Sequence, residues 1–269
     1  NIALNYVLIY GKFGFPALGL NGAGWATLLA RLIMLLAMLI LIATQELFKQ
    51  YWTGIWQRTR NRIVANRLVQ VGVPTGLQMI FEVGAFAFAA LMSGWISPEA
   101  QAAHNIAISL ASISYMVASG LAAAATVRVG NQLGRKDIAN LKQSAWVSYV
   151  LVGLFMVFSG VVFLVGKDVL PTLYIDEPEV VSIASSLLVI AVMFQLSDGI
   201  QAVGLAALRG LTDVRIPTWI TFFAYWAFAL PASYVLGFSF NLGPEGIWYG
   251  LAFGLTLSAV LLGWRFSYR

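Results

Sequence analysis

The chain has 269 residues, of which 60% are hydrophobic and only 10% are charged, and its mean hydropathy is +0.82. Globular proteins carry about 25% charged residues, so this composition excludes an ordinary water-soluble domain and indicates an integral membrane protein. The sequence has no cysteine, which excludes disulfides and cysteine metal sites, and its single histidine cannot form a histidine cluster. The net charge of +5 is spread over many connections, so we expect no nucleic-acid partner.

Apolar runs long enough to cross a bilayer follow one another along the chain. Residues 1–10 are shorter than the roughly 20 residues that a span needs, so we expect them to be the end of a helix. Complete spans are predicted near 18–43, 72–96, 102–127, 145–166, 180–207, 217–238 and 246–264. Each is expected to be helical, because backbone polar groups in lipid need partners within the segment. The fold class predicted is an all-α polytopic membrane protein.

The charges between these spans predict the orientation. Thirteen of the sixteen basic residues fall on one side if the spans alternate, and the positive-inside rule makes that side cytoplasmic. These residues are Lys49, Arg58, Arg60, Arg62, Arg67, Arg128, Arg135, Lys136, Lys142, Arg209, Arg215, Arg265 and Arg269. The sequence therefore predicts a multi-pass protein in a lipid bilayer, with its C-terminus in the cytoplasm.

Residues 45–67, QELFKQYWTGIWQRTRNRIVANR, form the longest hydrophilic connection. It mixes Tyr51, Trp52 and Trp56 with five basic residues, which predicts an interfacial helix or linker on the anionic cytoplasmic leaflet. We therefore predict three parts: residues 1–44 with a partial helix and one full span, the cytoplasmic linker 45–67, and a bundle of six helices over residues 68–269.

Two acids lie inside apolar runs, Glu82 in MIFEVG and Asp198 in QLSDGI. A carboxylate at the centre of a membrane helix costs roughly 2.5 to 3.5 kcal/mol, so it usually faces water, an ion or a partner. At 1.5 Å per residue, Glu82 lies about 22 Å from Arg67 and Asp198 about 16 Å from Arg209, near the midplane where transporter sites form. Alternatively, each acid only hydrogen-bonds a neighbouring helix, although Gln, Asn or Ser would do so at lower cost.

Five segments give the sequence a family resemblance: VGVPTGLQMIFEVGAFAF, PEAQAAHNIAISLASISYMVASGLAAAATVRVGNQLGRKD, YIDEPEV, SDGIQAVGLAALRGLTDVRIP and GIWYGLAFG. In this order and spacing they resemble the C-terminal half of the multidrug and toxic compound extrusion (MATE) transporters, in the bacterial NorM-like branch. Such transporters have two six-helix lobes around a central cavity. The resemblance implies that residues 68–269 are the second lobe, that residues 1–44 end the first, and that the N-terminal lobe is a partner.

The resemblance also implies a cation site. The acid that couples cation entry to drug exit in the family corresponds to Glu82, and its partner acid corresponds to Asp198. A tyrosine that joins the cation site corresponds to Tyr115 in SISYMV. Glu82 and Asp198 would then be the ligands of a monovalent metal cation. This chain departs from some relatives at Phe194, where they have a tyrosine, so coordination is expected to differ in detail.

A second site implied by the resemblance is the acidic pair Asp176 and Glu177, which would meet cationic substrates. The function expected is a Na+- or H+-coupled antiporter in the bacterial inner membrane that exports amphipathic, often cationic drugs, with no enzymatic activity and no cofactor. Two alternatives stay open. A flippase of lipid-linked oligosaccharides would need a strongly basic cavity for diphosphate, and a receptor or structural subunit would leave the two buried acids unexplained.

Overall fold

The computed structural model describes residues 1–46 and 62–268. The chain divides into two compact units, Asn1–Asn66 and Arg67–Arg269. In the first unit, α1 (Ile2–Tyr10) packs against α2 (Gly19–Thr44), where Gly22 lets the two backbones approach at Leu8. Most of the predicted linker, at 47–61, lies outside the described residues. Its last six residues, 62–67, are the first turns of the next helix, because no proline or glycine interrupts RIVANR.

The second unit is built from long helices. They are α5 (Arg62–Ile96), α6 (Pro98–Arg135), α7 (Ile138–Gly166), the short 3₁₀ helix η1 (Pro171–Leu173), α8 (Pro178–Gly210), α9 (Arg215–Phe222), η2 (Phe223–Ala229), α10 (Leu230–Tyr234), η3 (Val235–Ser239) and α11 (Gly243–Ser267). The segments from α9 to η3 form one continuous span. Counting α2, seven helices among the described residues are long and apolar enough to cross a membrane. The predicted all-α polytopic fold is confirmed.

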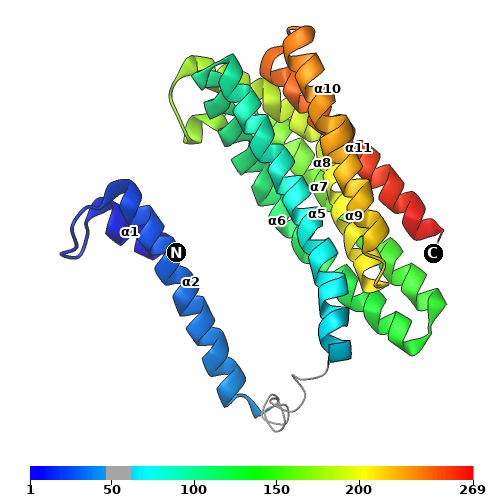
Figure 1. The fold of residues 1–269 in the computed structure, drawn as a ribbon. Coiled ribbons are helices and arrows are strands. Elements are labelled where there is room, and N and C mark those ends of the chain that lie inside the picture. Colours follow the sequence, from blue (N-terminus) through cyan, green and yellow to red (C-terminus); the bar gives the residue numbers. More distant parts are fainter. Residues whose placement is uncertain (47–61, 269) are drawn as a thin grey trace. The chain divides into compact units, whose positions relative to one another are not determined.

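The helix α8 lies at the centre of the second unit, with extensive contacts to α6, α7 and α11 (Figure 1). Small side chains allow the closest of these contacts: Ala118, Ala122 and Ala125 of α6 pack against α8 around Val203. Close approach of this kind supplies van der Waals contacts that lipid cannot replace. The helix α5 joins the same buried core through Ala85, Ala89 and Met92, each with at most 1% of its surface exposed.

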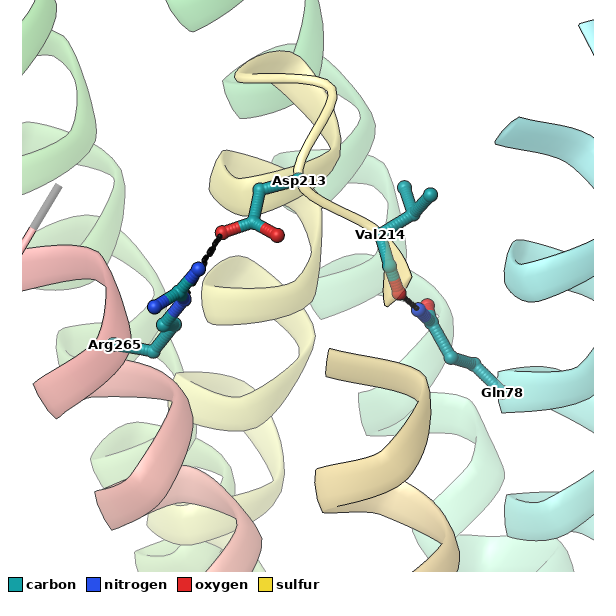
Figure 2. A network of polar contacts seen from close by, with 4 residues as sticks. All are labelled: Gln78, Asp213, Val214 and Arg265. Atoms are coloured by element: carbon teal, nitrogen blue, oxygen red, sulfur yellow. Dashed lines mark hydrogen bonds and ion pairs between the residues drawn. The ribbon is translucent and has the colours of Figure 1, made fainter. Parts of the chain in front are cut away.

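Successive helices run in opposite directions, so the unit has two chemically different ends. At one end α6 finishes with Arg135, α8 with Arg209 and α11 with Arg265, and we call it the basic end. There Arg265 of α11 pairs with Asp213 in the connection between α8 and α9, with its Nη2 2.9 Å from a carboxylate oxygen (Figure 2). Both side chains are largely buried. The ion pair therefore fixes the connection that follows α8.

The span from α9 to η3 contains two π-helical segments, η2 and η3. Such segments are rare and often occur at functional sites, because they shift the side chains that follow by a fraction of a turn. A line of glycines on α11, Gly246, Gly250 and Gly254, lets this irregular span approach closely. The hydroxyl of Ser233 donates to the carbonyl of Ile247 at 2.8 Å and ties the two helices together.

This contact can be tested with two matched Gly→Ala substitutions on α11. A Cβ at Gly250 would overlap the backbone and hydroxyl of Ser233, whereas a Cβ at Gly263 meets nothing within 4 Å. Overpacking costs about 1–3 kcal/mol, while Ala in place of an unrestrained helical Gly gains up to about 1 kcal/mol. We expect Gly250→Ala to lower the melting temperature of the detergent-solubilised protein by several degrees and Gly263→Ala not to lower it. Equal melting temperatures for the two variants would contradict the packing described.

Candidate functional site

The two acids of the apolar runs, both half-buried, face one cavity of about 220 Å³ in the second unit. Glu82 comes from α5, Asp198 from α8, and Tyr115 from α6, which lies between them in the chain. The residues that line this space, which we call the acid cavity, are Met79, Glu82, Val83, Phe86, Ile108, Ala111, Ser112, Tyr115, Phe194 and Asp198. The structure thus brings together all three residues predicted for a cation site.

Electrostatic contact links these residues. The Tyr115 hydroxyl is a hydrogen-bond partner of the Glu82 carboxylate, and Asp198 lies close enough to Glu82 for the two acids to repel each other when both are charged. The rest of the lining is mostly apolar, so the repulsion is poorly screened. A cation or a proton between the acids would relieve it. The chemistry of the cavity therefore favours a positively charged occupant.

The π-helical segment η2 joins the two helices that carry the acids. Tyr225 is fully buried, and its hydroxyl exchanges hydrogen bonds with the Gln201 amide of α8 at 2.7 and 3.1 Å, one turn beyond Asp198. The next residue, Trp226, donates from its indole nitrogen to the carbonyl of Phe81 on α5 at 3.1 Å. Consecutive residues of η2 therefore bind the two helices that carry Glu82 and Asp198. Sequence reasoning did not foresee this bridge.

Phe194 lies on the wall of the acid cavity with 2% of its side chain exposed. Its ring packs on Trp248 of α11 at a centroid distance of 5.6 Å. Trp248 in turn donates a hydrogen bond to Nδ1 of the buried His104 at 3.0 Å. His104 is thus a packing residue in this structure. The phenyl ring offers no oxygen ligand for a cation. The predicted oxygen ligands near Phe194 therefore come from Glu82, Asp198 and Tyr115.

A second cavity of about 180 Å³ lies on the side of Glu82 that faces the basic end. We call it the arginine cavity, because Arg209 lines it. Met79, Glu82 and Tyr115 line both cavities. Arg209 was predicted only as a charge at the end of a span, yet it faces this interior space from the last turn of α8. Gln78, with 3% of its surface exposed, also lines this cavity. A polar glutamine inside an apolar run was the feature of the sequence that could have pointed to this position.

The acidic pair Asp176 and Glu177 lies far from both cavities. The two residues are exposed in the connection between η1 and α8, where Glu177 is the residue before the helix begins. Along α8, Asp198 is 21 residues beyond Glu177, which is about 30 Å at 1.5 Å per residue. The structure therefore does not join the predicted substrate residues to the predicted cation site.

The donor set also limits which metal ion fits. Among residues 1–46 and 62–268, no group of three or more His, Cys, Asp or Glu side chains is placed to hold a metal ion. The carboxylates of Glu82 and Asp198 and the hydroxyls of Tyr115 and Ser112 suit a hard cation, because such cations prefer oxygen ligands. Two negative charges at most are available. The acid cavity is therefore better matched to a monovalent cation or a proton than to a transition metal.

Comparison with known proteins places the chain among membrane transporters. The MatE family model matches residues 74–235. The probable multidrug resistance protein NorM of Xylella fastidiosa (strain 9a5c) is 36% identical over 98% of this chain and 56% of its own length. The multidrug resistance protein MdtK of Photorhabdus laumondii is 37% identical over 100% of this chain and 60% of its own length. The chain thus spans little more than half of these relatives.

Solved structures support the same fold. The eukaryotic MATE transporter AtDTX14 has a TM-score of 0.83 at 23% identity, covering 98% of this chain and 58% of that one. The Vibrio cholerae MATE transporter VcmN in its bent form has a TM-score of 0.79 at 20% identity, covering 99% of this chain and 59% of that one. The resemblance predicted from the sequence is confirmed: because the family model matches more than half of its residues, the chain belongs to the MatE family.

Proposed function

We propose that the chain is the cation-coupling half of an antiporter that exports amphipathic, often cationic drugs. The observation that carries the proposal is the acid cavity, in which carboxylates from two different helices share one small space with a tyrosine hydroxyl. The names of the relatives, multidrug resistance proteins NorM and MdtK, support drugs as the exported compounds. The lobe that would complete a central drug cavity is the partner of this chain.

The coupling follows from the repulsion between the acids. A Na+ ion or a proton that enters the acid cavity neutralises Glu82 and Asp198, and α5 and α8 then approach each other at lower electrostatic cost. A ligand shifts a conformational equilibrium only through its different affinities for the two states. The cation therefore favours the state in which the helices close on it. Drug binding is weaker in that state, so cation entry drives drug exit.

The flippase alternative is disfavoured by the charge of the site. A diphosphate would need several basic groups, yet none of the residues that line the acid cavity is basic. Arg209 is the one basic residue that lines the neighbouring arginine cavity. We keep the antiporter as the proposed function, without enzymatic activity and without a cofactor. The basic end would face the cytoplasm of a bacterium, with the protein in the inner membrane, in agreement with the positive-inside rule.

The coupling role predicts the effect of removing the two charges. In the full-length protein, Glu82→Gln and Asp198→Asn should each reduce gradient-driven drug efflux to the level of vesicles without the protein. Both variants should fold as well as the wild type, because lipid disfavours the charge that they remove. Tyr115→Phe should lower efflux only severalfold, since a water molecule can replace one hydroxyl ligand. Efflux from reconstituted vesicles under imposed Na+ or pH gradients measures all three.

An acid outside the cavities supplies the matched control for these variants. Asp168 is exposed and accepts a hydrogen bond from Ser185 at 2.7 Å. Asp168→Asn removes the same charge from the membrane surface and should leave efflux within about twofold of the wild type, because surface interactions of this kind contribute little. Export that continues in the double variant Glu82→Gln, Asp198→Asn, with the same cation dependence, would refute the proposal.

A separate prediction concerns the exposed acids before α8. If Asp176 and Glu177 attract cationic substrates, then Asp176→Asn with Glu177→Gln should raise the apparent KM for a cationic drug severalfold. The dependence on the coupling cation should not change, because the pair lies about 30 Å along α8 from Asp198. Glu179→Gln, an exposed acid in the first turn of α8, is the matched control. An unchanged KM in the double variant would remove these two residues from the substrate path.

A further inference from the structure

Three cavities follow one another from the middle of the second unit to its basic end. The acid cavity and the arginine cavity share Met79, Glu82 and Tyr115, so Glu82 is reached from both. A third space of about 500 Å³, which we call the end cavity, opens at the basic end between α5, α6 and the connection from α8 to α9. Its lining includes Arg67, Val214 and Arg215. No residue lines both the arginine cavity and the end cavity.

A small cluster of hydrogen bonds centred on Gln78 separates these two cavities. The amide nitrogen of Gln78 donates to the carbonyl of Val214 at 3.1 Å and to the hydroxyl of Thr218 at 3.0 Å. Gln78 lines the arginine cavity and Val214 lines the end cavity, so their hydrogen bond lies at the partition (Figure 2). The Thr218 hydroxyl donates in turn to Val214 or to the carbonyl of Pro74, which binds α9 to α5. Side chains of α5 and α9 and the carbonyl of Val214 therefore meet at this partition.

The closed arrangement leaves two buried polar atoms of the arginine cavity's lining without a hydrogen-bond partner. They are Oε1 of Gln78, an acceptor, and Nε of Arg209, a donor. A buried polar atom without a partner costs free energy that is recovered when the atom meets water. Movement of the Gln78 side chain would admit water to both atoms. Opening of the partition would therefore give both atoms a hydrogen-bond partner.

The mixed polarity of the cavity indicates which ligand enters. Arg209 disfavours a metal cation, while Glu82 and the free carbonyl oxygen of Gln78 disfavour an anion. Water both donates and accepts hydrogen bonds, so it can satisfy Arg209 and Gln78 at once. A space of about 180 Å³ has room for several water molecules, each of which occupies about 30 Å³ in the liquid.

We propose that Gln78 is a gate that controls the entry of water from the basic end to Glu82 through the arginine cavity. The residues that line the passage all belong to this unit. Arg209 makes it unfavourable for metal cations, so it hydrates Glu82 without admitting Na+. The role given to the passage, hydration of Glu82, rests on the proposed function. The contacts that define the gate are those of Gln78, Val214, Thr218 and Arg209.

Cysteine labelling tests the gate. In a cysteine-free background of the full-length protein, Ala202→Cys places a thiol at a buried position on the wall of the arginine cavity, and Ser112→Cys on α6 places one in the acid cavity. A small, water-soluble, membrane-impermeant methanethiosulfonate reagent is added on the side that the basic end faces. We expect Gln78→Ala to speed modification of Ala202→Cys at least tenfold, and Thr218→Val, which removes one acceptor of Gln78, to speed it severalfold.

The controls make the outcome decisive. An unchanged rate at Ala202→Cys in both gate variants would overturn the proposal. An equal rise at Ser112→Cys would also overturn it, because it would show that the substitution loosens the whole unit. Labelling does not require transport, so the two proposals can fail separately. A protein that exports no drug but shows the rate increase retains the gate, whereas one that exports normally without the increase loses only the gate.

Reagents of opposite charge test the charge of the passage in the same preparation. With Gln78→Ala present, the carbonyl oxygen that disfavours an anion is gone, while Arg209 still lines the cavity. An anionic methanethiosulfonate should then modify Ala202→Cys several times faster than a cationic one of similar size. Arg209→Gln should abolish this preference. A faster reaction of the cationic reagent at Ala202→Cys would show that the passage admits cations and would contradict the role given to Arg209.

Discussion

The second unit is organised around the repulsion between two carboxylates that lie within the span of the membrane. Glu82 and Asp198 come from helices at opposite walls of one cavity, so the energy of the lobe depends on what lies between them. The lobe is otherwise held together by close contacts between small side chains, above all those of α6 and α8. These contacts change little when charge is added or removed. The acid pair is thus the part of the unit that a cation can act on.

The helix α5 is attached to the rest of the unit in two different ways. Beyond Glu82, Ala85, Ala89 and Met92 pack in the hydrophobic core. Before Glu82, Gln78 donates hydrogen bonds to Val214 and Thr218, and the carbonyl of Phe81 accepts one from Trp226. Glu82 therefore lies where the polar attachment of α5 gives way to apolar packing.

The cavities on the two sides of Glu82 differ in charge, and this difference separates two tasks. The acid cavity has carboxylates on two of its three helices and suits a cation. The arginine cavity carries Arg209 and two polar atoms without partners, and suits water. Met79, Glu82 and Tyr115 line both cavities, so a change in the charge of Glu82 affects the acid cavity and the arginine cavity together. The ion pair of Arg265 with Asp213 holds the connection that lines the end cavity.

The sequence by itself determined the class of the protein, the number of its complete spans and the two buried acids, because each of these depends on local composition and on the cost of charge in lipid. The motif spacing determined the family. Only the tertiary structure decided that Gln78 and Arg209 face one cavity, that the π-helical η2 joins the helices of both acids through Tyr225 and Trp226, and that Asp176 and Glu177 lie apart from them. These facts depend on which side chains of distant segments meet, and hydrophobic periodicity carries no information about such meetings.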